Sequence, residues 1–266
     1  MTKKELLDRC ARDGAERILL ARVLDKLELS QNRGVPAHTP FLSPGEQASV
    51  TDLLNAWGRP RHLFWGGYPD SERNLCLFLA DWQEEESVLA DPDGPLTALQ
   101  GTFPADASLT HRDILGSLMG VGITRELVGD ILLPRPGLCQ VAVLREAAPI
   151  LLSQWEGAGR YKVSLSEISL DRLIPRPAQV KTIRDTVATP RLDAVTAAGF
   201  SLSRGKAAAL IASGKVSLNH RECLKADRPV AEGDVLTCRG LGKCVVKEVP
   251  GQSKKGRTML VIERYV

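Results

Sequence analysis

The sequence has no uninterrupted run of about 18 apolar residues, the length that a membrane-spanning helix requires. Its opening stretch, MTKKELLDRCARDGAERILLARVL, carries a charge every few residues and lacks the apolar segment of a secretory signal peptide. These absences argue against a membrane or secreted protein. We therefore expect a cytoplasmic protein with no membrane partner.

The six cysteines form no Cys-x-x-Cys pair, and no histidine lies within zinc-ligand spacing of two of them. They are scattered along the chain as Cys10, Cys76, Cys139, Cys223, Cys238 and Cys244. We therefore expect reduced thiols, with neither disulfides nor a structural metal.

The common signatures of catalysis and cofactor binding are also missing. There is no phosphate-binding Walker loop, no dinucleotide glycine fingerprint and no Gly-x-Ser-x-Gly elbow. A methyltransferase would need a glycine-rich loop after its first strand, whereas WGGYPD precedes a predicted strand. The histidines lie in unrelated segments, as His38, His62, His111 and His220. We predict no catalytic residue and no cofactor.

What the sequence does contain is a marked asymmetry of charge. The chain of 266 residues has a net charge of +3. Residues 179–266 hold 16 lysines and arginines against 8 acidic residues, whereas residues 1–178 hold 19 against 24. A basic C-terminal third favours binding of a polyanion, and the acidic remainder is compatible with a protein partner.

The length and the 43% hydrophobic content fit one large domain or two to three small ones. Apolar spacing over residues 5–29 predicts one or two amphipathic helices. Pro44 and Glu46 favour the start of another helix, which Gly58 ends. We predict an α-rich N-terminal domain over residues 1–73.

From residue 74 the pattern changes to short apolar strands with two helices between them. The predicted strands are NLCLFLADW, PLTALQGTF, GDILL, CQVAVL and YKVSLSEI. They predict an α+β sandwich of ferredoxin-like or RNA-recognition-motif shape over residues 74–178, with PRPAQ at 175–179 as a linker. The aromatic strand on which RNA-recognition motifs stack bases is absent, so the shape alone does not imply RNA binding.

Residues 182–266 predict a third domain that begins with two short helices. Thr189 is a good N-cap residue and Pro190 suits the first position of a helix. Ser203 caps the second helix, which Gly214 ends.

A small antiparallel sheet is predicted after these helices. Its strands are separated by turns at Asn219 and Gly233. The closing segments KCVVKEV and TMLVIERYV predict a hairpin with a flexible basic tip that contains Lys254, Lys255 and Arg257.

Two cations occupy an unusual place in the second helix. Arg204 and Lys206 lie in its first turn, where the helix dipole disfavours each positive charge by a few tenths of a kcal/mol. With Arg191 at the start of the neighbouring helix, they would gather beside two helix N-termini whose free N–H groups favour anions. We predict a phosphate site here, with Asp193 a helix-start carboxylate able to pair with a neighbouring cation.

The segment RLDAVTAAGFSLSRGKAAALIASGKVSLN, followed by VAEGDVL, closely resembles the S4 domain, whose pattern is RLD, then SR, then IxxGxVxVN, then GD. Gly205 stands where that family often has a second serine. The resemblance implies an RNA-binding domain of two helices and a small sheet. The residues that we predict to contact RNA are Arg191, Ser203, Arg204, Lys206, Lys215, Asn219, Lys254, Lys255 and Arg257.

Three further motifs are similar to those of the bacterial YlmH-type proteins. They are WGGYPDSER at 65–73, LTHRDILGSLMGVGITRELVGDIL at 109–132 and the closing RGLGKCVVKEV with KGR and RYV. The similarity covers nearly the whole chain and implies a three-domain architecture. It also implies a non-enzymatic RNA-binding role, with association to the large ribosomal subunit, its rRNA and tRNA, in ribosome quality control or cell division.

Within these motifs the ordinary structural roles are favoured. We expect Gly66 and Gly67 to permit a turn with positive φ, and Tyr68 to pack. His111 and Arg112 lie in the first turn of a helix, and we expect them on its solvent side, with Arg112 an additional candidate for RNA contact.

Two other interpretations stay open. S4 domains are often appended to pseudouridine synthases, and RLD echoes the stretch that carries their catalytic aspartate, although here it begins the binding module and no second copy occurs. The alternative to such an RNA-modifying enzyme is a cell-division scaffold that binds protein through residues 1–178. The sequence alone does not identify the RNA, the oligomeric state, or whether the central domain contacts RNA or protein.

Overall fold

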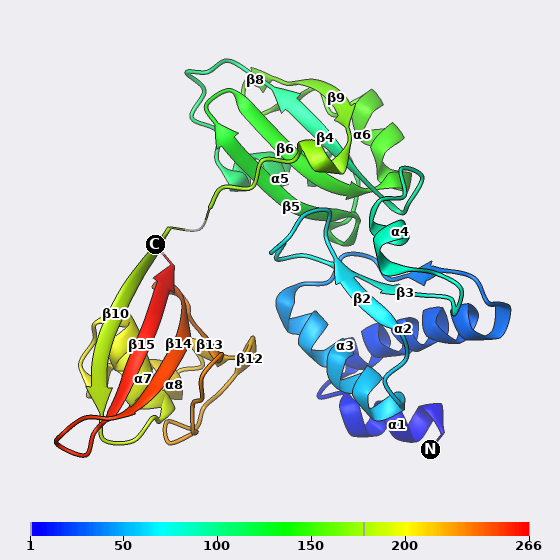
Figure 1. The fold of residues 1–266 in the computed structure, drawn as a ribbon. Helices are drawn as coiled ribbons and strands as arrows, with labels where there is room; N and C mark the ends of the chain where they lie inside the picture. Colours follow the sequence, from blue (N-terminus) through cyan, green and yellow to red (C-terminus); the bar gives the residue numbers. More distant parts are fainter. Residues whose placement is uncertain (1, 178, 266) are drawn as a thin grey trace. The chain divides into compact units, whose positions relative to one another are not determined.

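A computed structural model describes residues 2–177 and 179–265 (Figure 1). The chain divides into two compact units, Met1–Arg176 (unit 1) and Pro177–Val266 (unit 2), and each is considered by itself. Within the described ranges, no helix combines the length and the apolar composition needed to cross a membrane.

Three helices and a small sheet form the first part of unit 1. Its elements are α1 (Lys3–Cys10), α2 (Gly14–Arg33), β1 (Ala37–His38), α3 (Pro44–Trp57), β2 (His62–Trp65) and β3 (Leu75–Phe78). α3 starts as predicted, because Ser43 caps it in a capping box with Glu46. α2 ends at Gly34, whose φ of 62° suits a residue without a side chain. Leucines of the three helices share a core with β3.

β3 is the predicted strand NLCLFLADW, which we expected in the central domain. The structure instead places it in the middle of the first sheet, in the order β1-β3-β2. Leu77 lies opposite both His38 and Leu63. All four residues of β3 are buried, so apolar and polar residues do not alternate along it. The sequence therefore gives no sign of which of the two sheets this strand joins. β3 therefore belongs with the N-terminal elements, while the division of the chain into three domains stays a prediction.

The second part of unit 1 is a four-stranded antiparallel sheet with two main helices. In chain order its elements are α4 (Glu85–Leu89), β4 (Leu96–Thr102), α5 (His111–Gly120), β5 (Val128–Arg135), β6 (Leu138–Leu144), α6 (Ala148–Gln154), β7 (Gly157–Ala158), β8 (Tyr161–Lys162) and β9 (Ser164–Ile168). The sheet order is β5-β6-β4-β9, with every neighbouring pair antiparallel. A β-α-β-β-α-β chain with this order is ferredoxin-like, which confirms the predicted sandwich.

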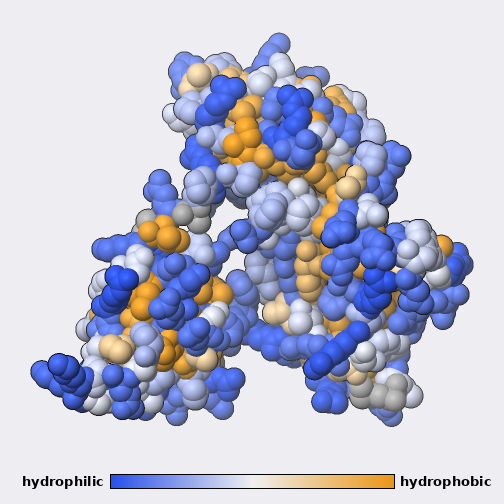
Figure 2. Space-filling view, viewed as in Figure 1, coloured by the Kyte–Doolittle hydropathy of each residue, from blue (hydrophilic) through white to orange (hydrophobic). Residues whose placement is uncertain are grey.

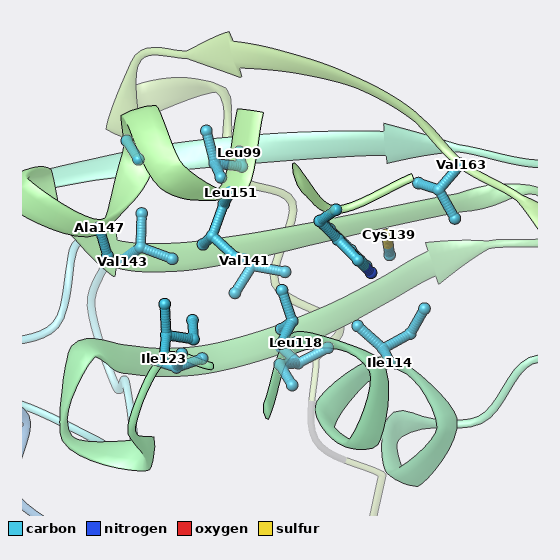
Figure 3. Packing of buried hydrophobic residues seen from close by; sticks show 14 of the residues in the cluster. Leu99, Ile114, Leu118, Ile123, Cys139, Val141, Val143, Ala147, Leu151 and Val163 are labelled. Carbon is cyan, nitrogen blue, oxygen red and sulfur yellow. The ribbon is translucent and has the colours of Figure 1, made fainter. Parts of the chain in front are cut away.

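One face of this sheet packs against α5 and α6. Figure 3 shows Leu99, Val141 and Val143 on the strands, facing Leu118 of α5 and Leu151 of α6. All five side chains are buried. This core fixes the sheet and covers one of its two faces.

Much of that other face is covered by the chain itself. A Cβ added to Gly67 would lie 3.1 Å from Leu170 Cδ2 and 3.9 Å from the Cβ of Ala142 on β6, so the 65–68 loop and the segment after β9 both lie over the sheet. Gln140 of β6 accepts a hydrogen bond from the Ile174 N–H at 2.8 Å, which holds that segment in place. The chain itself therefore occupies surface that an RNA-recognition motif would offer to bases.

Unit 2 is a six-stranded antiparallel sheet with two helices on one face. Its elements are β10 (Val180–Val187), α7 (Leu192–Phe200), α8 (Arg204–Ala212), β11 (Val216–Leu218), β12 (Arg221–Glu222), β13 (Val235–Cys238), β14 (Gly242–Gln252) and β15 (Thr258–Tyr265). The order is β10-β15-β14-β13-β11-β12. Val195 and Ile211 of the helices share a core with Val246 and Ile262 of the strands. This is the α+β architecture that the resemblance to the S4 domain implies.

β10 is an element that the sequence analysis did not predict. It pairs with β15 along its whole length, from Val180 opposite Tyr265 to Val187 opposite Thr258. Most of its side chains are exposed, because it is an edge strand with a single neighbour. Its polar sequence, VKTIRDTV, therefore lacks the apolar signal by which buried strands are recognised.

Two glycines in the helices of unit 2 differ in their surroundings. A Cβ on Gly199 of α7 would lie 2.7 Å from the Sγ of the buried Cys244, whereas a Cβ on Gly205 of α8 would have no atom within 4 Å. Both substitutions to alanine gain about 1 kcal/mol of helix propensity. Only the first adds overpacking, which costs about 1–3 kcal/mol.

We therefore expect Gly205→Ala to raise the free energy of unfolding of unit 2 by about 0.5–1 kcal/mol, and Gly199→Ala to lower it. Urea unfolding of the full chain, followed through amide NMR signals of unit 2, measures both. All four tryptophans lie in unit 1, so tryptophan fluorescence would not report on unit 2. Equal effects of the two substitutions would contradict this account of the packing.

Candidate nucleic-acid interface

The N-terminus of α8 is open to solvent. The Ser203 hydroxyl accepts a hydrogen bond from the Lys206 N–H at 3.3 Å, which confirms Ser203 as the N-cap. Within the described residues, the backbone N–H groups of Arg204 and Gly205 have no acceptor. All four side-chain positions from 203 to 206 are exposed. The helix therefore presents donors and its positive dipole end to an incoming anion.

The N-terminus of α7, in contrast, is closed by the chain itself. The Leu192 N–H donates to the Arg228 carbonyl at 2.8 Å, and the Asp193 N–H donates to the Ala226 carbonyl at 2.9 Å. Our expectation of two open helix N-termini is therefore wrong for α7.

The predicted cap of α7 is also wrong. The helix begins at Leu192, with Arg191 rather than Thr189 at the N-cap and no capping side chain. The Pro190 carbonyl instead accepts a hydrogen bond from the Val230 N–H at 2.9 Å. Carbonyls of the loop at 226–230 accept hydrogen bonds from the first N–H groups of α7, which a capping side chain would otherwise do. This contact joins residues far apart in the sequence, so the residues around the helix start do not predict it.

Asp193 joins the two helices through an ion-paired cluster. Its Oδ2 accepts a hydrogen bond from Arg204 Nε at 2.9 Å, and its Oδ1 lies 3.4 Å from Arg191 Nε. We call Arg191 and Arg204, held by Asp193, the arginine pair. The pairing expected for Asp193 is confirmed. The picture of three uncompensated cations is wrong, because two of them share a carboxylate of their own chain.

The charges in this cluster still favour an anion. Only 5% of Asp193 is exposed, whereas the side chains of Arg191 and Arg204 are 38% and 58% exposed. Burial by itself raises the pKa of Asp193, but the hydrogen bond from Arg204 and the two positive charges outweigh it and lower the pKa below its usual value. With Lys206, the cluster keeps a net charge of about +2 and holds two guanidiniums in fixed orientation at the surface.

Lys215 and Asn219 lie away from the arginine pair. Nine helical residues span about 13 Å, so Lys215 lies beyond the opposite end of α8. Its carbonyl accepts from the N–H of Arg239, a second exposed cation, at 2.8 Å. Asn219 occupies the predicted turn with a φ of 49°, and both polar atoms of its side chain are bonded, to Asp234 and to the Val235 N–H. Asn219 therefore has a structural role in this turn.

The tip of the β14–β15 hairpin is a hydrogen-bonded turn rather than the flexible tip that we expected. The Ser253 N–H donates to the Arg257 carbonyl at 2.7 Å, and Arg257 Nε donates to Thr186 Oγ1 of the edge strand at 3.1 Å. Lys254 and Lys255 stay exposed. Figure 2 shows the corresponding strongly hydrophilic surface at this tip.

One basic segment of unit 2 was missed by the sequence analysis. Lys225 and Arg228 are exposed on the loop whose carbonyls close the α7 N-terminus. The corresponding sequence is HRECLKADR, a segment with four basic side chains if His220 is included. The S4 pattern has no fixed residue there, so the resemblance does not single out this segment.

The motifs of unit 1 meet around one carboxylate. Asp130 accepts hydrogen bonds from the Tyr68 hydroxyl at 2.7 Å, from the Glu72 N–H at 2.7 Å and from the Arg73 N–H at 3.1 Å. A Cβ on Gly66 would lie 2.2 Å from the Arg73 carbonyl oxygen. WGGYPDSER is therefore a tight loop that closes on the GDI segment. Of its two glycines only Gly67 has positive φ, at 103°, whereas the close approach excludes a side chain at Gly66.

Two arginines complete this junction. Arg73 donates to the carbonyls of Val128 and Phe41, both at 3.1 Å, and Arg125 donates to the Gly129 carbonyl at 3.0 Å. Burial, with Arg73 as a neighbouring cation, lowers the pKa of Arg125 to about 10. These side chains are used to hold the parts of unit 1 together. No cluster of His, Cys, Asp or Glu able to hold a metal occurs among the described residues.

The arginine pair predicts a measurable effect at Asp193. Asp193→Asn removes the charge and should lower the free energy of unfolding of unit 2 by about 1–3 kcal/mol at pH 7, less than for a fully buried pair because both guanidiniums face solvent. The folded-state pKa is lowered, so this stabilisation is full above about pH 4 and is lost as the pH falls through the folded-state pKa. The variant should lack that part of the pH dependence.

Urea unfolding at pH 7 and pH 3, followed by the NMR signals of unit 2, makes the comparison. Asp227→Asn is the matched control, since Asp227 is exposed and has no recorded partner in the described chain. If the Asp193 and Asp227 variants were equally stable at pH 7, the carboxylate would not hold the cluster together.

Comparison with known proteins adds family information to this geometry. Three family models match: "YlmH, N-terminal" over residues 15–78, "Putative RNA-binding domain in YlmH" over 102–172 and "S4 domain" over 190–236. A solved structure, "Cell division protein ylmH from Streptococcus pneumoniae", covers 62% of this chain and 97% of its own, with a TM-score of 0.50. At 24% identity this likeness concerns the fold alone.

A curated relative extends the similarity along the chain. "Ribosome-associated protein quality control protein P2" of Bacillus subtilis (strain 168) is 32% identical over 251 residues. The match covers 94% of this chain and 95% of the relative. Together with the three family models, it shows that the chain belongs to the YlmH family, with an S4 domain at its C-terminal end.

Proposed function

We propose that this protein binds structured RNA through unit 2 and associates with the ribosome without catalysing a reaction. The observation that carries the proposal is the arginine pair beside the open N-terminus of α8. There, two oriented guanidiniums, two backbone N–H groups without acceptors and Lys206 lie within the first turn of one helix and the adjoining helix start. Phosphate is the RNA group that such donors fit.

The recognition expected at such a surface is of backbone shape rather than of base edges. Guanidinium forks, lysines and helix N-termini contact phosphates and carry no sequence information of their own. Lys254 and Lys255 at the hairpin tip and Lys215 beyond the far end of α8 add exposed charges. A junction or loop that places phosphates at several of these points would be bound more tightly than a plain helix.

The comparisons support the ribosomal part of the proposal. The relative's name describes a ribosome-associated quality control protein. By extension, we propose rRNA of the large subunit and tRNA as the RNA partners, with ribosome quality control or cell division as the process and the cytoplasm as the location. A protein partner of unit 1 stays part of the proposal.

The structure gives no support to a pseudouridine synthase type of RNA-modifying enzyme. The catalytic aspartate suggested by the RLD motif would be Asp193, and this side chain is buried and bonded to Arg204. In the structure this carboxylate joins the two helices and is not exposed to a base. Binding without catalysis therefore fits the site better.

Reversal of three exposed cations tests the proposal. Lys206→Glu with Lys254→Glu and Lys255→Glu alters side chains that form no ion pair with any described residue, so the fold should persist. If unit 2 neutralises about five phosphates, its contacts should contribute a slope of about −3.5 to −4.5 to the fall of the logarithm of affinity against the logarithm of salt concentration. The variant should bind at least about tenfold more weakly, with a slope shallower by about 2–3.

The measurement is a KCl titration of the full chain with purified large ribosomal subunits and, separately, with tRNA. Lys4→Glu with Arg22→Glu and Lys26→Glu is the matched control, because it changes the net charge equally on exposed helix positions of unit 1. A wild-type slope near zero, or equal losses in the two variants, would contradict the proposal.

A further inference from the structure

Unit 1 carries a second basic surface, at the end of the central sheet where β5 turns into β6. Four exposed cations lie on the segments that meet at this end or lead into it: Arg135, Arg160, Lys162 and Arg176. We call this set the sheet-end surface. It belongs to a part of the chain that is acidic as a whole, with 19 lysines and arginines against 24 acidic residues in 1–178.

Strand register brings polar groups from four strands to this end. Arg135 of β5 lies opposite Leu138 of β6, Leu138 opposite Thr102 of β4, and Thr102 opposite Ser164 of β9. Directly opposed residues point to the same side of a sheet. Arg135, Thr102 and Ser164 therefore form one row on the face away from α5 and α6, and all three are exposed.

The other cations are attached to this row by the chain around it. Arg176 Nε donates to the Pro134 carbonyl at 3.3 Å, which places Arg176 beside the β5–β6 turn. Lys162 precedes Ser164 by two residues. Arg160 stacks on Tyr161, with its guanidinium carbon 5.1 Å from the ring centroid, and donates to the Tyr161 hydroxyl at 2.9 Å. These contacts orient the side chains without neutralising them.

None of the four cations is ion-paired within the described part of the chain. This differs from the junction around Asp130 in the same unit, where Arg73 and Arg125 are half-buried and bonded to carbonyls. Exposed cations without a carboxylate partner give this end of the unit a positive potential, which favours an anionic partner.

The central sheet itself is unsuited to base stacking. Its two middle strands pair Ala98 with Ala142 and Gln100 with Gln140, so no aromatic ring lies at their centre. Gln140 Nε2 donates to Gln100 Oε1 at 3.1 Å and to the Arg172 carbonyl at 3.0 Å, under the segment that crosses the sheet after β9. We therefore expect RNA to contact this domain at the end of the sheet and not on the face of the sheet.

We propose that the sheet-end surface is a second RNA-binding site, which holds the phosphate backbone through Arg135, Arg160, Lys162 and Arg176 and the hydroxyls of the Thr102 row. This inference rests on the proposed function of unit 2 and adds a contact made by unit 1. Arginine, lysine, serine and threonine are the side chains that bind phosphate and sugar. A protein partner would favour a central aromatic or aliphatic anchor, which the row lacks.

The sheet-end surface and unit 2 are close in sequence, which suits binding of both to one RNA molecule. Arg176 is the last residue of unit 1, and β10 of unit 2 begins at Val180. Once unit 2 is bound, the short connection keeps the sheet-end surface at high effective concentration near the same RNA. Weak individual phosphate contacts then add to the overall affinity.

Charge reversal at the sheet end tests the inference. Arg135→Glu with Arg160→Glu and Lys162→Glu should weaken binding of the full chain to large ribosomal subunits at least about tenfold and make the salt slope shallower by about 2–3. The variant with lysine at positions 135 and 160, Arg135→Lys with Arg160→Lys, should keep most of the affinity, because phosphate contact needs the charge. Lys4→Glu with Arg22→Glu and Lys26→Glu is again the control, and circular dichroism checks the fold.

The outcomes separate the two proposals. If the sheet-end variant binds like the control while reversal of Lys206, Lys254 and Lys255 abolishes binding, the inference is overturned and the proposed function stands. If wild-type binding has no salt dependence and neither reversal matters, the proposed function fails as well. If the sheet-end variant loses binding to intact subunits but keeps full binding to protein-free rRNA and to tRNA, the partner is a protein and the inference is again overturned.

Discussion

A buried carboxylate that holds two arginines at the surface is the interaction on which the basic unit depends. Asp193 is almost fully buried, and burial without partners would cost several kcal/mol. Arg204 and Arg191 offset that cost and, in return, have their guanidiniums fixed at the junction of α7 and α8. The same contact that joins the two helices therefore also orients the donors that we propose to bind phosphate.

The two helix ends of unit 2 are used differently. The α7 N-terminus is closed by the carbonyls of Ala226 and Arg228, whereas the α8 N-terminus keeps two donors without acceptors. Unit 1 shows a similar division, since Asp130 and Arg73 close its motif loop while the end of its central sheet is left polar and basic. In both units, hydrogen-bonded groups build the scaffold, and the exposed cations lie on the surfaces proposed to bind RNA.

Local patterns predicted the elements whose signals lie within a few residues. Ser203 and the glycine after α8 indicated that helix, and short apolar runs indicated the strands of the ferredoxin-like sheet. The cap of α7, the sheet that contains β3 and the edge strand β10 were missed, because each is decided by a partner far along the chain. The row that joins Arg135 to Ser164 was invisible for the same reason, since strand register is a property of pairing rather than of composition.

The most direct test of the central claim is a structure, by electron cryomicroscopy, of the full chain bound to large ribosomal subunits. The account predicts an RNA phosphate within hydrogen-bond distance, about 3 Å, of the Arg204 side chain and of the first backbone N–H groups of α8, with Asp193 still bonded to Arg204. A bound complex in which this helix end faces solvent, or in which Asp193 has released Arg204 to reach the RNA, would contradict it.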